Sequence, residues 1–445
     1  MEKEDIIKKL DERDYKSLKK YLIETNEADL AEIIEEIDSK EYALIIFRML
    51  PKEFAVDVFS YLDVDTQVDI ASAVSEVELK HIVDELYFDD MIDLLEEMPV
   101  EFVDKVLEFV TPEKRKLVNE FLKYPEYSAG SIMTIEYVSL NKNFTVREAM
   151  DYIRKVGLSK ETIYTCYVTT NTKKLIGIVS LRKLVTSNPD EKIVDLMEED
   201  MIYINTNDDQ EDVADKFKRY GFLAMPVVDA QMRLVGIITV DDIIDVMEDE
   251  ATEDFQKMAA MTPTDESYLD TSVFTLARHR LPWLLILMVT ATLTGGIIKK
   301  YDDLLGKFLI LSTFIPMLTD TGGNAGSQSS TLVIRGLATG DIKVSDFFKV
   351  VFKEFRISLI CGITLAFINF LRLVFISGES VLISLTVCTT LIFTVMMSKV
   401  LGGVLPIAAK KMNFDPAIMA GPLITTVVDT MSLAIYFRVA SLLLF

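Results

Sequence analysis

The sequence is poor in the residues that zinc enzymes and disulfide-bonded proteins depend on. Its 445 residues include three cysteines, two histidines and one tryptophan. The cysteines form no CxxC pair and no disulfide framework, which is typical of a protein in a reducing compartment. The histidines, His81 and His279, do not form an HExxH motif, so we exclude a membrane metalloprotease and expect no enzyme.

Basic residues are also scarce, with 46 Lys and Arg against 70 Asp and Glu and a net charge of −24. Residues 275–445 carry 15 basic and 9 acidic side chains, a net of +6, so the first 274 residues carry −30. An acidic half repels phosphate backbones, which excludes nucleic-acid binding, and it either attracts cations or only aids solubility. Half of the residues are hydrophobic and the mean hydropathy is +0.27, which is too apolar for disorder.

Long apolar runs in residues 275–445 predict membrane spans, because about 20 helical residues cross a bilayer. Five such runs occur, at 281–298, 308–334, 357–376, 381–409 and 416–445. The first residues hold no apolar run typical of a signal peptide, so we place the acidic half in the cytoplasm and the C-terminus outside the cell (inner) membrane. Nine basic residues flank the spans inside and four outside, which agrees with the positive-inside rule.

The second span contains polar residues that lipid alone would not accept. Asp320, Asn324 and Gln328 recur every fourth residue and therefore share one helix face. Small residues at 322–326 allow neighbouring backbones to approach closely. Two interpretations stay open here, a packing seam of small residues with polar contacts or a polar pore wall.

The last span contains a carboxylate, Asp429, which lies 14 residues after Asp415. On a continuous helix this spacing is roughly 21 Å at ~1.5 Å per residue, deep in the bilayer. Such a group costs roughly 2.5–3.5 kcal/mol to insert, which favours a functional role. A site for a hard cation, with Thr425 one turn back and a carbonyl freed by Pro422, is one interpretation. An ion pair with Lys399 is the other.

The first half contains an internal repeat. Residues 175–181 (LIGIVSL) match residues 234–240 (LVGIITV), 59 positions later, and Ile132-Met133 matches Leu196-Met197. The surrounding pattern predicts a βαββα unit twice. Residues 1–124 read instead as amphipathic helices separated by prolines, at Pro51, Pro99 and Pro112.

An acidic helix follows the second repeat. At about 100° per residue, four carboxylates fall within about 80° of one another. They are Asp242, Asp245, Asp249 and Glu253. Because like charges on one stripe repel, solvent or bound divalent cations must offset them. Asp57, Asp89, Asp93, Asp209 and Glu211 add further carboxylates that could face this stripe.

Five motifs in this order resemble the MgtE family of magnesium channels and transporters over essentially the whole chain. They are FDDMIDLLEEMP at 88–99, YPEYSAGSIMT at 124–134, GIITVDDIIDVMEDEATED at 236–254, DTGGNAGSQS at 320–329 and DPAIMAGPLITTVVD at 415–429. The resemblance implies a homodimer in the lipid membrane. Its implied domains are an α-helical N-domain (1–124), an α/β tandem CBS module (125–249), a connecting plug helix (250–274) and a five-helix transmembrane domain (275–445).

The resemblance also implies passive Mg²⁺ flux and closure by cytoplasmic Mg²⁺. The implied pore residues are Asp429, Thr425, Asn324 and, at the cytoplasmic mouth, Asp415. The implied regulatory ligands are Asp57, Asp89, Asp93, Asp209, Glu211, Asp242, Asp245, Glu250, Glu253 and Asp254. Gly236, Thr239 and Asp242 fit a CBS nucleotide pattern, so ATP is a candidate ligand of the second repeat, whereas the first repeat has Lys183 at the Asp position.

One regulatory position departs from the family pattern. Many members have an acidic residue after the Tyr of the second CBS helix, where this chain has Gly221. Three other functions remain to be compared with Mg²⁺ transport. A broader divalent-cation carrier that includes Co²⁺ is the alternative within transport. A CBS-bearing chloride channel conflicts with Asp320 and Asp429, and a membrane-anchored sensor conflicts with the polar second and fifth spans.

Overall fold

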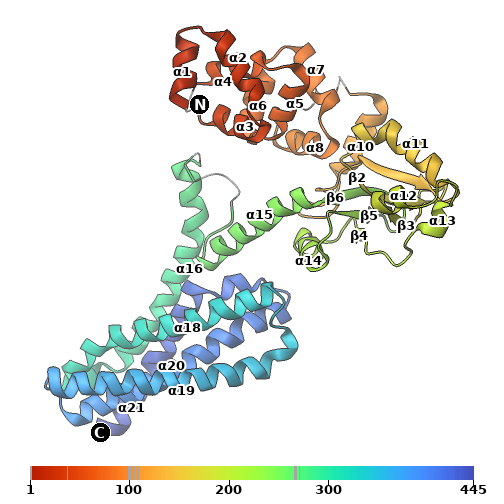
Figure 1. Cartoon of the computed structure of the whole chain (residues 1–445). Coiled ribbons are helices and arrows are strands. Elements are labelled where there is room, and N and C mark those ends of the chain that lie inside the picture. The colour runs from red at the N-terminus through yellow and green to blue at the C-terminus, as the bar shows by residue number, and fades with distance from the viewer. Residues whose placement is uncertain are drawn as a thin grey trace. The chain divides into compact units, whose positions relative to one another are not determined.

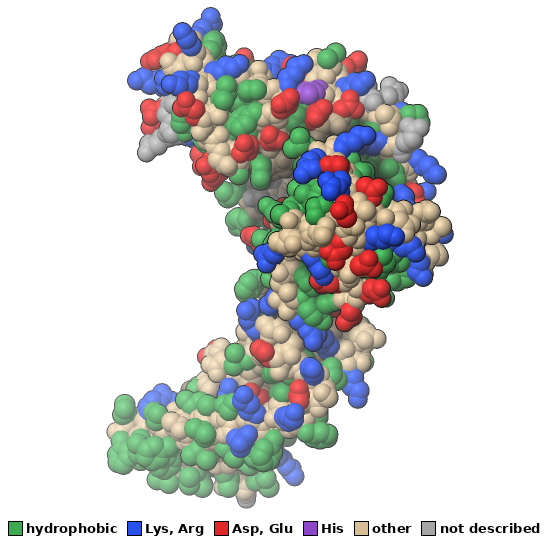
Figure 2. Space-filling view, turned by 45° about the vertical axis from the view of Figure 1, so that its right-hand side comes forward, with side chains coloured by type: hydrophobic (Ala, Val, Ile, Leu, Met, Phe, Trp, Pro, Cys, Tyr) green, Lys and Arg blue, Asp and Glu red, His purple; other side chains and the backbone are tan. Residues whose placement is uncertain are grey.

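The computed structural model describes residues 3–37, 39–98, 103, 106–107, 110–264, 268–269 and 271–444. They form two compact units, Met1–Met247 and Glu248–Phe445, each of which is treated by itself below (Figure 1). The first unit contains short helices and two small sheets, and the second is built from long helices. Hydrophobic side chains cover much of the surface of the long helices, whereas charged side chains dominate the surface of the first unit (Figure 2).

The first unit starts with short helices, several of which begin at a residue whose side chain caps the helix. Asp63 Oδ1 accepts a hydrogen bond from Thr66 N at 2.7 Å, and Ser75 forms a capping box with Glu78. Pro51 and Pro112 stand at helix starts, and Pro99 lies outside the described residues. The helices are α1 (Lys3–Asp11), α2 (Tyr15–Glu24), α3 (Glu27–Glu35), α4 (Lys40–Met49), α5 (Lys52–Ser60), α6 (Val64–Ala73), α7 (Glu76–Glu85), α8 (Phe88–Glu97) and α10 (Pro112–Phe121).

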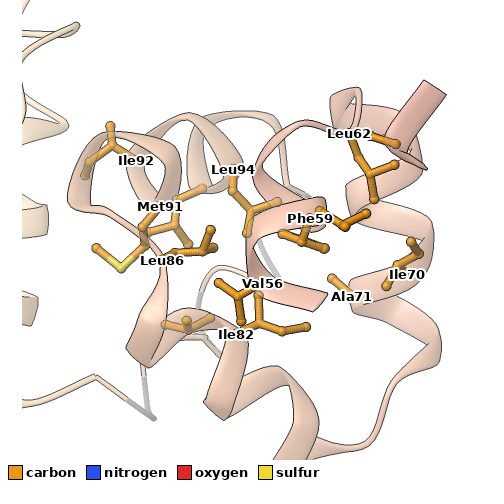
Figure 3. Packing of buried hydrophobic residues seen from close by; sticks show 14 of the residues in the cluster. Val56, Phe59, Leu62, Ile70, Ala71, Ile82, Leu86, Met91, Ile92 and Leu94 are labelled. Carbon is orange, nitrogen blue, oxygen red and sulfur yellow. The ribbon is translucent and has the colours of Figure 1, made fainter. Parts of the chain in front are cut away.

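These helices pack their apolar faces into one core. Val56 of α5, Ile82 of α7 and Leu94 of α8 are among the buried side chains that Figure 3 shows pointing toward one another. The same cluster continues into the second repeat through residues such as Phe217 and Ile243. The predicted all-α N-domain is confirmed, and its core is shared with the module that follows.

The repeat forms two sheets of the same topology, which confirms the predicted pair of βαββα units. In each sheet the first two strands are parallel and the last two antiparallel. The first unit of the repeat contains β1 (Tyr137–Asn141), α11 (Val146–Val156), β2 (Thr162–Thr169), β3 (Leu175–Ser180) and α12 (Leu181–Thr186). The second, preceded by α13 (Ile193–Leu196), contains β4 (Ile204–Asn205), α14 (Gln210–Tyr220), β5 (Ala224–Val228), β6 (Leu234–Thr239) and α15 (Val240–Met258).

The matching Met residues explain why each repeat carries a glycine in its last strand. A Cβ added at Gly236 would lie 2.8 Å from Met133 Sδ and 2.7 Å from Thr134 O. A Cβ at Gly177 would lie 2.9 Å from Met197 Sδ. The methionine before the first repeat therefore covers the glycine of the second, and the methionine before the second covers the glycine of the first.

The long helix α15 buries Ile243 and Val246, whereas Ile244, Met247 and Phe255 are exposed. Helix α15 ends at Met258, so the predicted plug segment 250–274 is not one helix; residues 259–264 and the described residues of 268–272 are turns or irregular backbone, and the next helix begins at Val273. The apolar side opposite the acidic stripe is thus solvent-facing within one chain.

The described residues of the second unit form five long helices, joined by shorter segments. Four of them are long and apolar enough to cross a membrane, namely α16, α19, α20 and α21 with their flanking turns. The fifth, α18, carries the polar face predicted for the second span. The elements are α16 (Val273–Lys300), α17 (Asp302–Lys307), α18 (Ile315–Ala338), α19 (Phe347–Leu371), α20 (Val381–Lys411) and α21 (Gly421–Leu444).

Helix α18 packs against α20 and α21, and its glycines face these neighbours. A Cβ added at Gly323 would lie 2.9 Å from Thr425 Cγ2 of α21, and Gly326 and Gly402 of α20 are similarly close. Asp320, Asn324 and Gln328 are exposed on another face of α18. The small residues of this helix therefore form the predicted packing seam. Its polar residues remain accessible on another face, and their role as a pore wall stays a prediction.

Candidate cation sites

The last helix begins later than its sequence suggests, which changes the depth of Asp429. Asp415 caps a short 3-10 turn, Pro416–Met419, and its Oδ1 accepts a hydrogen bond from Ala417 N at 2.8 Å. Ala420 is extended, so α21 starts only at Gly421. The assumption of one continuous helix from Asp415 was wrong, and Asp429 lies eight residues into α21, about 12 Å along its axis.

Pro422 also plays a different part from the one predicted. It falls in the first turn of α21, where a proline breaks no helical hydrogen bond. Its own carbonyl accepts the hydroxyls of Thr425 and Thr426, both at 2.9 Å. The Thr425 side chain is thereby held beside Gly323 of α18. A carbonyl freed by Pro422 for an ion was therefore a wrong prediction.

Lys399 does not neutralise Asp429. Its Nζ lies 3.3 Å from Oε1 of Gln328, and its side chain is 6% exposed. Asp429 interacts electrostatically with a second carboxylate, Asp320 of α18. The alternative of an Asp429–Lys399 ion pair is thus wrong for this structure.

Asn324 lines a groove between α18, α19 and α20. The groove has a volume of about 860 Å³ and is also lined by Gln328, Glu354 and Lys399. Glu354 is buried and accepts a hydrogen bond from Ser329 Oγ at 2.6 Å. The predicted proximity of Asn324 to Asp429 is not among these contacts and stays a prediction.

The end of α15 meets the start of the last span through an ion pair that the sequence analysis did not foresee. Lys257 Nζ lies 2.7 Å from Asp415 Oδ2 and 2.5 Å from Glu253 Oε1. Burial alone would lower the pKa of Lys257, but these two carboxylates raise it to about 12. Burial and then the charge of Asp415 raise the pKa of Asp254. An ammonium group therefore stands among three carboxylates that were predicted as cation ligands.

Apolar contacts support the same junction. Met258 packs beside Ile334 of α18 and beside Ala417 and Ala420 of the turn before α21. A Cβ added at Gly421 would lie 3.2 Å from Met258 O. The C-terminal end of α15 is thus seated on the end of the membrane helices where Asp415 lies.

A cluster of buried carboxylates lies within the first unit. Burial, and then the charges of Asp90 and Asp242, raise the pKa of Asp89 to about 9. Burial with Asp242 and Asp241 raises the pKa of Asp90 to about 7, and burial with the same two aspartates raises that of Glu161 to about 7. Asp89 Oδ1 and Glu161 Oε2 are buried without a hydrogen-bond partner. In this arrangement the carboxyl groups are more stable when they are protonated, or when a cation is bound, than as unpaired anions.

The predicted regulatory residues Asp89 and Asp242 are therefore brought together, and the structure adds four acidic residues that the sequence analysis missed. They are Asp90, Glu136, Glu161 and Asp241. Asp90 and Asp241 directly follow or precede a predicted ligand, which is a signal the sequence contained. Glu136 and Glu161 flank strands β1 and β2, and no spacing rule connects them to α8.

Two of the other predicted regulatory residues act near this cluster. After burial, the charge of Asp245 is among those that raise the pKa of Asp242, and the charges of Asp57 and Asp89 are among those that raise the pKa of Tyr87. Burial and then Glu27 raise the pKa of Asp57 on α5. Asp209 caps α14 by accepting a hydrogen bond from Glu211 N at 2.9 Å. Asp93 is exposed on α8, and Asp245 and Glu250 lie on α15. In the part of the chain that the structure describes, no three His, Cys, Asp or Glu side chains are close enough to hold a metal ion.

The nucleotide pattern has a structural role in this chain. Thr239 Oγ1 donates to Asp242 Oδ2 at 2.6 Å, which ties the start of α15 to β6. Burial raises the pKa of Asp242 to about 6, although this hydrogen bond opposes the shift. Gly236 is needed where Met133 and Thr134 approach the strand. ATP binding at these residues stays a prediction.

These features define a multi-pass membrane protein with a carboxylate inside its helical bundle and a tandem CBS module joined to it by an acidic helix. Family models match the chain as the MgtE intracellular N domain at residues 25–127, CBS domains at 129–188 and 193–249, and a divalent cation transporter at 315–439. The chain belongs to the MgtE family.

Individual relatives agree with this assignment. The magnesium transporter MgtE of Thermus thermophilus is 36% identical over 359 residues, which is 80% of this chain and 79% of the relative. The magnesium transporter MgtE of Bacillus subtilis is 37% identical over 357 residues, which is 79% and 78%. The crystal structure of the cytosolic domain of the Mg²⁺ channel MgtE in complex with ATP is 33% identical with a TM-score of 0.52, and covers 55% of this chain and 100% of that one.

Proposed function

We propose that the protein carries Mg²⁺ passively across the cell membrane and that Asp429 holds the ion on its way. Mg²⁺ keeps several of its water molecules, so one or two carboxylates suffice to bind it. The observation that carries this proposal is a half-buried Asp429 whose nearby charged group is another carboxylate, Asp320, while Lys399 is bonded to Gln328. A cation offsets two such carboxylates in the membrane interior.

The test is Mg²⁺ influx into liposomes that contain the full chain. Asp429→Asn keeps the shape of the side chain and removes its charge, so we expect influx to fall to background while the protein remains folded. Asp303→Asn, on the exposed turn helix α17, is the matched control and should leave influx unchanged. Normal influx through folded Asp429→Asn would refute the role of this residue. Addition of Lys399→Met should not restore influx, because Lys399 is not the partner of Asp429.

We also propose that Mg²⁺ in the cytoplasm closes the pathway by binding to the acidic residues of the first unit and of α15. The support in the first unit is the cluster of Asp89, Asp90, Glu161 and Asp242, where two buried oxygens have no hydrogen-bond donor. A divalent cation would offset the repulsion that raises these pKa values. In the second unit, Glu253, Asp254 and Asp415 gather where α15 meets the start of α21.

Closure is tested by protease protection of residues 241–274 in a Mg²⁺ titration, measured beside flux. Asp89→Asn with Asp242→Asn should raise the Mg²⁺ concentration that protects this segment, because two ligands are lost. Asp5→Asn with Asp65→Asn, two exposed changes that remove the same total charge, is the control. Wild-type protection that is the same with and without Mg²⁺ would rule out closure by the cation.

Three finer assignments belong to the same proposal. The functional molecule is a homodimer, for which the exposed residues Ile244, Met247 and Phe255 of α15 offer apolar surface. ATP binds beside Thr239, as the ATP complex of the related cytosolic domain suggests. Selection of Mg²⁺ over Co²⁺ distinguishes a magnesium protein from a broader divalent carrier, and Co²⁺ competition in the influx assay separates them.

A further inference from the structure

A polar pocket of about 530 Å³ lies at the end of the bundle where α19 turns into α20, away from Asp429 and from the α15 junction. Its wall includes Thr313, Asn369, Arg372, Ser377 and Glu379. It holds one basic and one acidic side chain. Neither belongs to the cation sites described above.

Arg372 is held in place on its protein side. Its Nη2 and Nε lie 2.9 and 3.1 Å from Oδ1 of Asn369, and Nη2 also contacts Sδ of Met317 at 3.8 Å. Asn369 is only 8% exposed and donates to Cys388 Sγ, so the acceptor is itself fixed. These contacts use Nε and Nη2, and among the described residues Nη1 has no hydrogen-bond acceptor. A guanidinium that is ordered in this way loses little freedom when it binds an oxyanion.

Glu379 is fixed by the turn that follows. Residues Arg372–Ile376 form a π-helical turn, a form that is frequent at functional sites. Ser377 N donates to Arg372 O and Glu379 N donates to Leu373 O, both at 3.0 Å, and Gly378 has a φ of +69°. The backbone therefore places a carboxylate on the same pocket wall as the guanidinium.

The pocket opens among apolar side chains. Phe314, Met317 and Leu373 complete its lining, and the neighbouring Phe375 and Ile376 are 77% and 82% exposed. In a membrane-spanning bundle, this is the level where lipid headgroups meet acyl chains. A ligand for this site needs a phosphate for Arg372, a cationic group for Glu379 and an apolar tail.

We propose that this pocket binds the headgroup of a phospholipid with a primary ammonium, phosphatidylethanolamine. The phosphate accepts hydrogen bonds from Nη1 of Arg372, and the ammonium donates to the carboxylate of Glu379. The quaternary ammonium of phosphatidylcholine has no N–H to donate, so Glu379 distinguishes the two lipids. The acyl chains lie along Phe375 and Ile376. This site is independent of Mg²⁺ transport.

The experiment places the full chain in nanodiscs with equal phosphatidylethanolamine and phosphatidylcholine, then strips it mildly and counts retained lipids by mass spectrometry. We expect wild type to retain phosphatidylethanolamine with about tenfold preference, since each tenfold is about 1.4 kcal/mol and a charge-assisted hydrogen bond supplies this. Arg372→Gln should lose retained phospholipid of both kinds. Glu379→Gln should keep phospholipid and lose the preference.

Two control variants separate binding in this pocket from a general charge effect and from misfolding. Lys300→Gln removes one exposed charge from another helix end. This variant should retain lipid as wild type does, because retention depends on the pocket and not on a general attraction of positive charge for phosphate. Arg372→Lys keeps the charge, so the amount of phospholipid that it retains should lie between those of wild type and Arg372→Gln. This graded result would exclude misfolding as the cause of the loss in Arg372→Gln. Equal retention by wild type and Arg372→Gln would overturn the site. Displacement by soluble phosphoethanolamine as easily as by lipid would show a site for free headgroup instead and would also overturn the proposal.

Discussion

The ion pair between Lys257 and Asp415 gives the sharpest test of how α15 is attached to the membrane helices. Replacing Lys257 by Gln removes a charge that lies 2.7 Å from Asp415 and 2.5 Å from Glu253, while most of the side-chain length is kept. Without Mg²⁺, this ammonium pairs directly with two of the carboxylates, Glu253 and Asp415, and attracts the third, Asp254. We expect the variant to release α15 more readily in Mg²⁺-free solution.

The size of the effect follows from the pKa of Lys257, which rises from 10.5 to about 12. At about 1.4 kcal/mol per pKa unit, this shift corresponds to about 2 kcal/mol of interaction in the folded chain. The side chains of Lys257 and Asp415 are 21% and 29% exposed, so water screens part of the attraction. We therefore expect about 1 kcal/mol, or about fivefold in the ratio of seated to released α15. Because the pKa is raised, this contribution is complete below pH 10.5 and is lost only as the pH approaches 12.

The assay is a double-mutant cycle on protease protection of α15 in the presence of a chelator. Lys257→Gln is combined with Asp415→Asn, since an Asn at this position still accepts the hydrogen bond from Ala417 N. Lys411→Gln, an exposed change of the same charge, is the control. In saturating Mg²⁺, protection of Lys257→Gln should return fully, because the cation replaces the ammonium. If the two changes add without coupling, or if Lys257→Gln equals wild type in chelator, the ion pair does not hold α15.

Two further predictions concern the first unit. In Mg²⁺-free solution its stability should fall as the pH rises from about 4, where these carboxyl groups ionise in the unfolded chain, to about 9, because the raised pKa values of Asp242, Glu161 and Asp89 mean that folding favours their protonated forms. The stabilisation by Mg²⁺ measured by thermal unfolding should therefore increase over the same range, and a pH-independent Mg²⁺ effect would contradict the cluster. Gly236→Ala should destabilise the tandem module by about 1–3 kcal/mol in urea unfolding, because its Cβ would lie 2.7 Å from a backbone carbonyl. Gly157→Ala should cost less, because its Cβ would meet only the side-chain methyl groups of Ile163 at 3.3 Å and Ile153 at 3.8 Å; equal losses would argue against the close approach at Gly236.

The sequence predicts the elements of this protein well because they depend on local patterns. The 59-residue repeat predicts the two βαββα units, and the amphipathic pattern interrupted by prolines predicts the helices of the first unit. Gly421-Pro422 is a local signal for the break at Ala420, but the spacing estimate assumed one continuous helix from Asp415, so it missed where α21 begins.

Partners that come from distant segments were predictable only in part. Asp89 and Asp242 meet as the family resemblance implies, yet Glu161 joins them from the turn before β2, which no periodicity connects with α8. Lys257 lies in a segment rich in carboxylates. Repulsion among these carboxylates suggested bound cations, so no role was predicted for the lysine. Its partner Asp415 is more than 150 positions away, and only the folded chain brings them together.

The crosswise covering of the two CBS glycines sets an order of events when the chain is made. Met197 covers Gly177, so the first repeat lacks part of its packing until the chain has grown some 20 residues beyond that strand. Met133 covers Gly236, so the second repeat completes itself on a segment that was synthesised about a hundred residues earlier. Neither repeat is a closed folding unit, and a chain cut between them leaves an uncovered glycine strand on each fragment. The two repeats therefore complete their packing only when both are present in one chain.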